Sequence, residues 1–247
     1  MKVEVLKNIL MELGIECARI IEEKVDLQFL ALKNLHKNLG DDELFIKLVI
    51  ANSIVSYQLS GKGEQWWLEF SHYFSQNPPK EGILRAYFEF LPKSKTNKRI
   101  LQPKLKRLEK LEPFLDTLTV KDLMDYYRNM VKFRNDLARA MRSKGEAKTI
   151  VFAVKMFGYA SRIAFGEFIP YPMEIDIPKD FRIENYTKRL TSQDLVKFWR
   201  EIALEVNIPP LHIDSILWPV LGGDDRVIDR LKKYCGKSDF VLRLASI

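Results

Sequence analysis

The chain has 247 residues, of which 47% are hydrophobic and 30% are charged, and it carries a formal net charge of +7. This length fits one large domain or two small ones, with enough apolar residues for a sizeable core. No uncharged apolar run reaches the roughly 18 residues that a membrane-spanning helix needs, and Met1 to Val5 lack a signal-peptide pattern, so we expect an intracellular protein without a membrane partner.

Apolar residues recur at helical spacing along nearly the whole chain, and we find no convincing strand, internal repeat or low-complexity tract. In chain order, the predicted helices cover residues 3–13, 15–39 (one or two helices), 44–59, 64–74, 81–91, a helix in the basic segment ending before Pro113, 121–141, 148–165, 181–190, 192–208, 211–220, 226–235 and a short C-terminal helix. A glycine-rich connection, 222–224, leads into the 226–235 helix. The sequence therefore predicts an all-α protein, which we treat as a single domain over 1–247.

Several residues at the ends of these segments are typical helix signals. Gly14 and Gly40 are placed to end helices, since glycine adopts the left-handed conformation without strain. Asp41 or Asp42 can cap the following helix, and Thr119 can cap the helix over 121–141.

A lysine stands at the head of an apolar helix that follows a short hairpin over 142–146. Lys148, Phe152, Lys155 and Tyr159 share one helical face. Burial and a nearby cation each lower a lysine pKa, by up to roughly 3–5 units for full burial, and a neutral amine can then form a Schiff base. Alternatively, Lys148 is an ordinary first-turn lysine that extends to water.

The basic charge is concentrated in residues 93–110, which hold eight basic residues and one acidic residue. Such a segment can follow a phosphate backbone. It can equally be the solvated face of a helix. Both interpretations stay open.

Cysteine and histidine are too sparse for common metal sites. Cys17 and Cys235 are the only cysteines and have no CxxC spacing, so we expect neither a four-cysteine zinc site nor an iron–sulfur cluster. His36, His72 and His212 form no HxxxH or HExxH pattern. We predict no metal and no cofactor, although a carboxylate site for magnesium stays open. His212 lies between two apolar residues and is expected to be a hydrogen-bonded structural histidine.

The order helix, glycine-containing hairpin, lysine-headed helix and later aspartate resembles the helix–hairpin–helix DNA glycosylases. The closer resemblance is to the archaeal GO glycosylases, which are 8-oxoguanine DNA glycosylase/AP lyases. It is carried by separated motifs at 26–29, 56–64 with Trp67, 148–152, 177–183 and 208–218. The hairpin departs from the wider superfamily, because Gly145 is its only glycine and Glu146 would sit near a bound phosphate.

The resemblance implies the helix–hairpin–helix glycosylase fold, with two helical lobes around a basic cleft and the hairpin and catalytic helix at about 121–165. It implies that Lys148 is the Schiff-base nucleophile and Asp180 the catalytic carboxylate. Phe152 and Trp218 would sandwich the extruded base, and Gln28 would hydrogen-bond its edge. The remaining pocket residues that it implies are Trp67, Lys155, Pro172 and Asp214.

These roles make physical sense, because an enzyme that acts on a base must extrude it from the stack, and aromatic faces return part of the cost. Each residue also has a structural alternative: Phe152 and Trp218 as core residues, Gln28 as a polar helix residue, Asp180 as an N-cap. The structural alternative for Asp214 is an acidic residue near the start of a helix that interacts favourably with the helix dipole.

The expected function is excision of 8-oxoguanine from double-stranded DNA, with single-stranded DNA as a further candidate substrate, by a monomer that also nicks the strand. One alternative is a glycosylase of the same fold that acts on another damaged base. The other is a non-catalytic helical protein that binds nucleic acid through residues 93–110.

Overall fold

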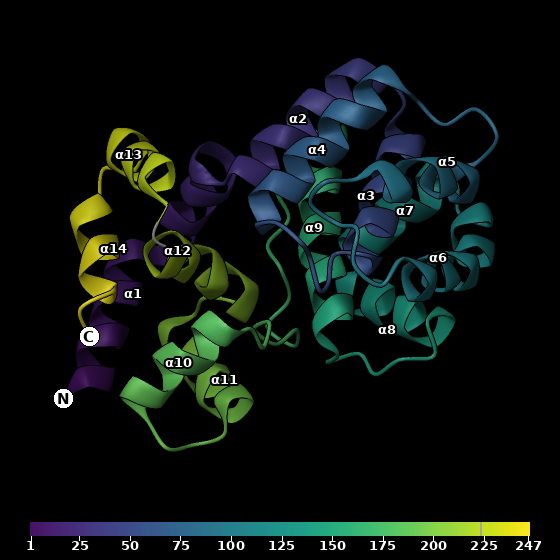
Figure 1. Cartoon of the computed structure of the whole chain (residues 1–247). Helices are drawn as coiled ribbons and strands as arrows, with labels where there is room; N and C mark the ends of the chain where they lie inside the picture. Colours follow the sequence, from purple (N-terminus) through teal and green to yellow (C-terminus); the bar gives the residue numbers. More distant parts are fainter. Residues whose placement is uncertain (223) are drawn as a thin grey trace. The chain divides into compact units, whose positions relative to one another are not determined.

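The structure, a computed structural model, describes residues 1–222 and 224–247, and all regular elements of this part of the chain are helical (Figure 1). The all-α prediction is confirmed. The chain divides into two compact units. Unit 1 consists of residues 1–29 and 170–247, and unit 2 consists of residues 30–169. The assignment of residues 1–247 to a single domain stays a prediction.

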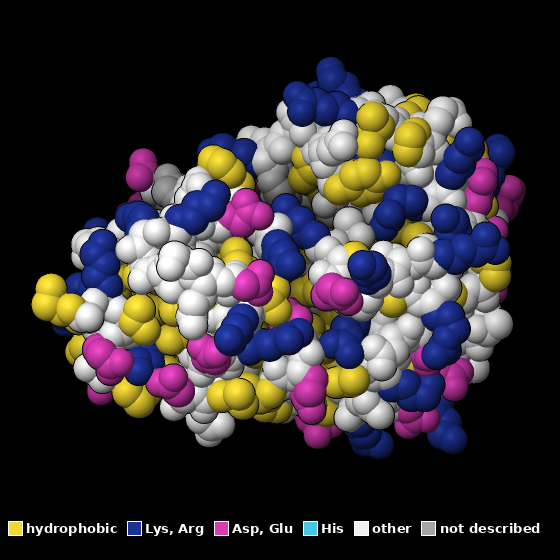
Figure 2. All heavy atoms as spheres, turned by 90° about the horizontal axis from the view of Figure 1, so that it is seen from below, with side chains coloured by type: hydrophobic (Ala, Val, Ile, Leu, Met, Phe, Trp, Pro, Cys, Tyr) yellow, Lys and Arg dark blue, Asp and Glu magenta, His cyan; other side chains and the backbone are white. Residues whose placement is uncertain are grey.

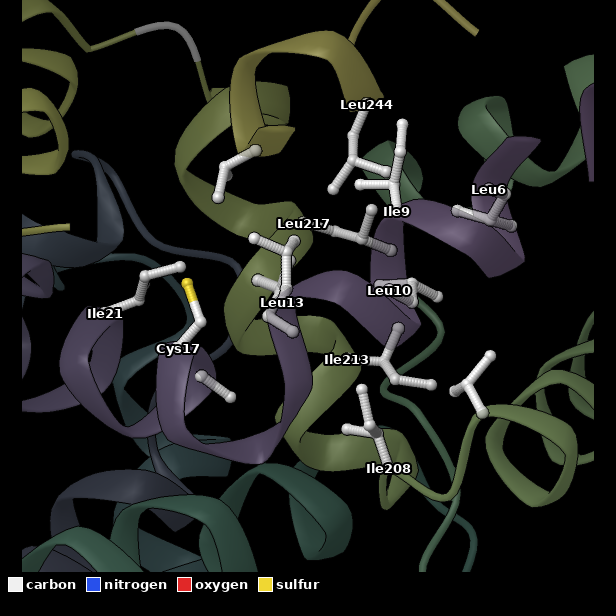
Figure 3. Packing of buried hydrophobic residues seen from close by; sticks show 14 of the residues in the cluster. Leu6, Ile9, Leu10, Leu13, Cys17, Ile21, Ile208, Ile213, Leu217 and Leu244 are labelled. Atoms are coloured by element: carbon white, nitrogen blue, oxygen red, sulfur yellow. The ribbon is translucent and has the colours of Figure 1, made fainter. Parts of the chain in front are cut away.

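Unit 1 joins the first helices of the chain to its last ones. Its elements are α1 (Lys2–Ile20), the π-helix η1 (Ile21–Val25), the first residues of α2 (Leu27–Leu39), α10 (Phe181–Leu190), α11 (Leu195–Val206), α12 (Pro210–Gly222), α13 (Asp225–Tyr234) and α14 (Ser238–Leu244). Helix α12 is central, since it packs against α1, α10, α11, α13 and α14. Ile213 and Leu217 of α12 meet Leu10 and Leu13 of α1 in a shared apolar core (Figure 3).

Unit 2 is built around two apolar helices that pack along each other, α3 (Asp42–Ile54) and α9 (Lys148–Phe165). Their inward-facing residues are almost all buried, which explains why both segments read as nearly continuous apolar sequence. Around them lie α4 (Gly63–Gln76), α5 (Ile83–Phe90), the 3-10 turn η2 (Leu91–Lys93), α6 (Leu101–Asp116), α7 (Val120–Arg128) and α8 (Met130–Ala140).

The helix starts predicted from capping residues are confirmed at two positions. Asp41 caps α3 by accepting from the Leu44 N–H, and Thr119 caps α7. Gly14, with a φ of 66° and a ψ of 179°, has a non-helical backbone that separates two helical segments of α1, so the predicted helix end after Leu13 is confirmed. The helix resumes after it because Cys17 and Ala18 bury their side chains in the core of unit 1.

Other predicted boundaries were wrong. The helix predicted over 44–59 ends at Ile54, and the one predicted over 121–141 is two helices separated by Asn129, whose φ of −138° is not helical. Pro113 lies within the last turn of α6, where it forgoes one backbone hydrogen bond without ending the helix. Helix α11 starts at Leu195 because Asp194, rather than Ser192, caps it. Of the connection over 222–224, Gly223 lies outside the described residues.

Lysine and arginine side chains recur over the face shown in Figure 2, with acidic side chains among them. Among the described helices, none is both long and apolar enough to cross a membrane.

Candidate active site

Lys148 is the first residue of α9 and is exposed. Ala147, with extended backbone angles, precedes the helix. In the free protein, burial therefore does not strip water from the Lys148 ammonium. The buried lysine of this helical face is Lys155, two turns along, with 6% of its surface exposed.

The hairpin before α9 is held by backbone hydrogen bonds. After α8, the Ser143 N–H donates to the Ala138 carbonyl at 2.9 Å, and Arg142 occupies the left-handed region with a φ of 50°. The tight turn therefore uses an arginine where a glycine is the common choice. A Cβ at Gly145 would lie 3.3 Å from Nε of Arg134, so this arginine side chain would have to shift by a few tenths of an ångström to accommodate it.

Phe152 lies one turn after Lys148 and is half-buried. Its ring meets the ring of Trp67 from α4 edge to face, with centroids 6.1 Å apart and planes at 64°. Trp67 itself is fully enclosed and also contacts Phe70 edge to face. The structure thus brings Phe152 and Trp67, two residues predicted separately, into direct contact beside the head of α9.

A second group of side chains near Lys148 was not predicted. Arg107 of α6 donates from Nη2 to Oγ1 of Thr149, the residue after Lys148, at 3.0 Å. Its Nε donates to the Ile54 carbonyl at the end of α3, at 3.2 Å. The Arg107 guanidinium also lies over the ring of Tyr57, 5.2 Å from its centroid. The signal that could have identified this link is Tyr57 itself, which lies within the motif at 56–64.

The Tyr57 ring also contacts a second basic residue, which is a buried lysine. Lys104, a member of the basic segment, is fully buried, with its Nζ 5.3 Å from the Tyr57 centroid. It donates to the Arg99 carbonyl at 2.8 Å and to Asn97. Burial, with a smaller contribution from the charge of Arg99, lowers the pKa of Lys104 to about 8.

The basic segment is consequently not one uniform surface. Its exposed members are Lys93, Lys95, Lys98, Arg99, Lys106 and Lys110. Lys104 and Arg107 instead bind the protein's own groups, so they serve the structure of unit 2.

The other predicted site residues belong to unit 1. Asp180 is the N-cap of α10, and its Oδ1 accepts from the Ile183 N–H at 2.9 Å. The residue is half-buried, which leaves surface for a ligand. Pro172, also half-buried, lies in the loop before this helix and its carbonyl accepts from the Ile175 N–H.

Helix α12 carries two further predicted residues, Asp214, which is 6% exposed, and the half-buried Trp218. They lie one turn apart on the central helix of the unit. Gln28, in the first turn of α2, donates its backbone N–H to the Asp26 carboxylate at 2.9 Å, and the residue is half-buried.

His212 is a structural residue, as predicted. It is fully buried, its Nε2 accepts from the Tyr171 N–H at 3.2 Å, and its Nδ1 lies 2.7 Å from the Glu22 carboxylate. Because Nε2 accepts, Nδ1 carries the proton and donates to Glu22. In the part of the chain that the structure describes, no group of three or more His, Cys, Asp or Glu residues is arranged to hold a metal ion.

Chemically, the head of α9 offers a solvent-accessible primary amine beside an aromatic pair. Unit 1 offers a carboxylate at the head of α10 and a partly accessible tryptophan on α12. An amine nucleophile, a carboxylate and aromatic faces are the groups that base extrusion and covalent attack on a sugar carbon require.

Comparison with known proteins identifies the family. A family model described as AGOG, N-glycosylase/DNA lyase, matches residues 7–242. A Thermococcus kodakarensis N-glycosylase/DNA lyase is 66% identical over the whole chain and 94% of its own length. A Methanococcus maripaludis N-glycosylase/DNA lyase is 51% identical over 90% of this chain and 88% of its own.

The structural comparison agrees. The crystal structure of the 8-oxoguanine DNA glycosylase of Pyrobaculum aerophilum in complex with 8-oxoguanosine is similar, with a TM-score of 0.79 and 28% identity over 99% of this chain and 95% of that one. The fold is therefore that of a helical DNA glycosylase, and the chain belongs to the AGOG family of N-glycosylase/DNA lyases.

Proposed function

We propose that this protein excises 8-oxoguanine from DNA and then cleaves the strand at the resulting site. Membership of the AGOG family supports the two activities, and the Pyrobaculum aerophilum relative, solved with 8-oxoguanosine, supports the base. The observation that carries the proposal is the position of Lys148, an accessible amine at the head of a helix whose next turn presents Phe152 against Trp67.

In the proposed reaction the Lys148 amine attacks C1′ of the damaged nucleotide as the bond from C1′ to the base breaks. The base leaves with the bonding electron pair and takes up a proton. Loss of a proton from the lysine nitrogen and opening of the sugar give a Schiff base. Removal of a C2′ proton then expels the 3′ phosphate, which nicks the strand by β-elimination.

The remaining roles follow from the resemblance and the local geometry. The Asp180 carboxylate supports the positive charge that develops on the sugar, while its cap to Ile183 fixes its direction. Phe152 and Trp218 stack on the extruded base, and Gln28 hydrogen-bonds its edge. Trp67, Lys155, Pro172 and Asp214 complete the pocket. Bound DNA excludes water from Lys148, which the free protein leaves exposed.

The test is covalent trapping. The protein is incubated with duplex DNA that contains one 8-oxoguanine, borohydride is added, and the protein–DNA adduct is measured on a denaturing gel. The wild type should form an adduct that Lys148→Gln loses. Lys121→Gln is the matched control, because Lys121 is an exposed lysine of α7 outside the hairpin and the same charge is removed. An undiminished adduct in Lys148→Gln would remove the proposed nucleophile.

Other substrates test the rest of the proposal. Faster excision of a different damaged base than of 8-oxoguanine would replace the proposed substrate with that base. Single-stranded DNA that carries the same lesion is the further candidate substrate, and its adduct is measured in the same assay. Size-exclusion chromatography with light scattering should report the mass of a monomer.

A further inference from the structure

The two cysteines of the chain lie together in the core of unit 1. Cys17 is in the second half of α1, and Cys235 directly follows α13. Their Sγ atoms are 3.1 Å apart, although 218 positions separate the residues in the sequence. Both thiols are almost fully buried, and Cys17 packs beside Leu13 and Ile21 (Figure 3).

We propose that Cys17 and Cys235 are a reversible redox pair that closes into a disulfide under peroxide, tying the N-terminal segment of unit 1 to its C-terminal segment. The proposal does not depend on the DNA chemistry, because neither cysteine belongs to the candidate active site.

The geometry favours closure. A disulfide needs sulfur atoms about 2.05 Å apart, so the two thiols must approach each other by only about 1 Å. Cys235 can supply this movement, because it has left the helix with an extended backbone, at φ −102° and ψ 108°. Gly236 follows it, and a Cβ added there would meet no atom within 4 Å.

The surroundings also favour reaction. The Lys237 ammonium is held close by, in an ion pair with Glu12 of α1 at 3.0 Å. The hydrogen bond with Cys17, together with the backbone N–H and the charge of Lys237, lowers the pKa of the Cys235 thiol against the opposing effect of burial. The same hydrogen bond and burial raise the pKa of Cys17. We assign Cys235 as the thiolate that reacts first, because it lies two positions before the Lys237 ammonium and has the extended backbone that lets it move, and the thiolate is the nucleophile.

Hydrogen peroxide is the oxidant. The Cys235 thiolate attacks one peroxide oxygen, the O–O bond breaks, and the departing hydroxide takes up a proton as water, which leaves a sulfenic acid. The Cys17 sulfur then attacks the Cys235 sulfur, the S–O bond breaks, and hydroxide leaves with the Cys17 proton as a second water. The sum is two thiols and one peroxide giving one disulfide and two waters.

The disulfide would join the two separate chain segments of unit 1 by a covalent bond. Unit 1 is assembled from residues 1–29 and 170–247, and the bond joins one segment to the other. Constraining such a long loop in the unfolded chain should raise Tm by about 5 °C or more. A protein of this family would then keep unit 1 assembled under the oxidising conditions that damage bases.

The experiment counts thiols in the native full-length protein. The reduced protein is treated with hydrogen peroxide, denatured in excess N-ethylmaleimide, and weighed by intact mass spectrometry. The untreated protein should take up two maleimides, one for each cysteine of the chain. The treated protein should take up none and weigh less by two hydrogen atoms. Trypsin should release peptide 8–19 linked to peptide 234–237, and dithiothreitol should separate them.

The matched variants are Cys17→Ser and Cys235→Ser, which should give neither the linked peptides nor the rise in Tm on oxidation. If either variant fails to fold, the wild-type mass and peptide map still decide the proposal. Two maleimides after treatment, a sulfinic acid on Cys235 without a linked peptide, or disulfide-linked dimers in place of the internal bond would each overturn it.

Discussion

Arg107 of α6 reaches Thr149, the neighbour of Lys148, with a hydrogen bond of 3.0 Å between Nη2 and Oγ1. The same guanidinium donates to the last carbonyl of α3, that of Ile54, at 3.2 Å. One side chain therefore links the end of α3 and the start of α9 in unit 2. These contacts fix where the first turn of α9, and with it Lys148, begins.

Replacing Arg107 with methionine should slow formation of the trapped adduct about tenfold or more, since a hydrogen bond from a charged group is worth about 1.5–3 kcal/mol. Single-turnover kinetics on 8-oxoguanine duplex measures the effect. Lys106→Met is the control, because Lys106 is exposed on the same helix and the same charge is lost. Equal losses in both variants would mean that Arg107 acts only through the overall charge.

Asp180 has two separable roles, as helix cap and as proposed catalytic carboxylate. Asparagine caps helices about as well as aspartate, so Asp180→Asn should change the free energy of unfolding by less than about 0.5 kcal/mol. Excision should nevertheless fall by about 100-fold or more, because the charge is gone. Asp180→Ala should lose both the helix cap and the catalytic charge, and its free energy of unfolding should fall by about 1 kcal/mol. Denaturant unfolding and single-turnover excision measure the two effects, and normal excision by the asparagine variant would refute the catalytic role.

Phe152 supplies an aromatic face whose edge contact with Trp67 holds it in place. Phe152→Leu should lose about 0.5–1.5 kcal/mol of stability with the ring contact. It should also weaken binding of lesion DNA by about tenfold, because stacking is worth roughly 1–3 kcal/mol per base. Phe152→Tyr keeps the face and is the control. Titration of both variants against lesion and undamaged duplex should show a loss for lesion DNA in the leucine variant alone; similar affinities would contradict the stacking role.

Lys104 should make stability depend on pH in the alkaline range. Its pKa is lowered from 10.5 to about 8 by burial, so between these values the unfolded chain binds the proton more tightly than the folded one. The contribution of Lys104 to the free energy of unfolding therefore rises as pH increases from 8 towards 10.5. Against Lys104→Met, the wild type should gain about 1–2 kcal/mol across this range. Urea unfolding of both proteins at pH 7 and pH 10 measures the gain, and parallel pH profiles would contradict it.

Much of the helical framework could be predicted because the signals are local. Asp41, Thr119 and Asp180 cap helices through hydrogen bonds to residues three positions on, so their roles are written in a few consecutive residues. The errors arose at boundaries where a further local signal was missed. Asn129 caps α8 by accepting from the Lys132 N–H, and it divides the helix predicted over 121–141.

The site was predictable in part. Helical spacing placed Lys148, Phe152 and Lys155 on one face, and the resemblance gave each a role that stays a prediction. Spacing could not say that Lys148 would be exposed and Lys155 buried, because exposure depends on which helices pack alongside. The contacts of Phe152 with Trp67 and of Arg107 with Thr149 join residues that lie far apart in the sequence.

The sequence by itself determined an all-α chain, the positions of its main caps, its family resemblance and the identity of the candidate nucleophile. These follow from periodicity, short-range hydrogen bonding and motif order, which act within or along the chain. Only the tertiary structure decided three contacts. Lys104 is buried against the ring of Tyr57, Arg107 hydrogen-bonds to Thr149 at the start of α9, and the thiol of Cys17 contacts that of Cys235. Such pairings depend on how helices pack in three dimensions, since van der Waals contact and hydrogen bonding act over a few ångströms of space whatever the separation in sequence.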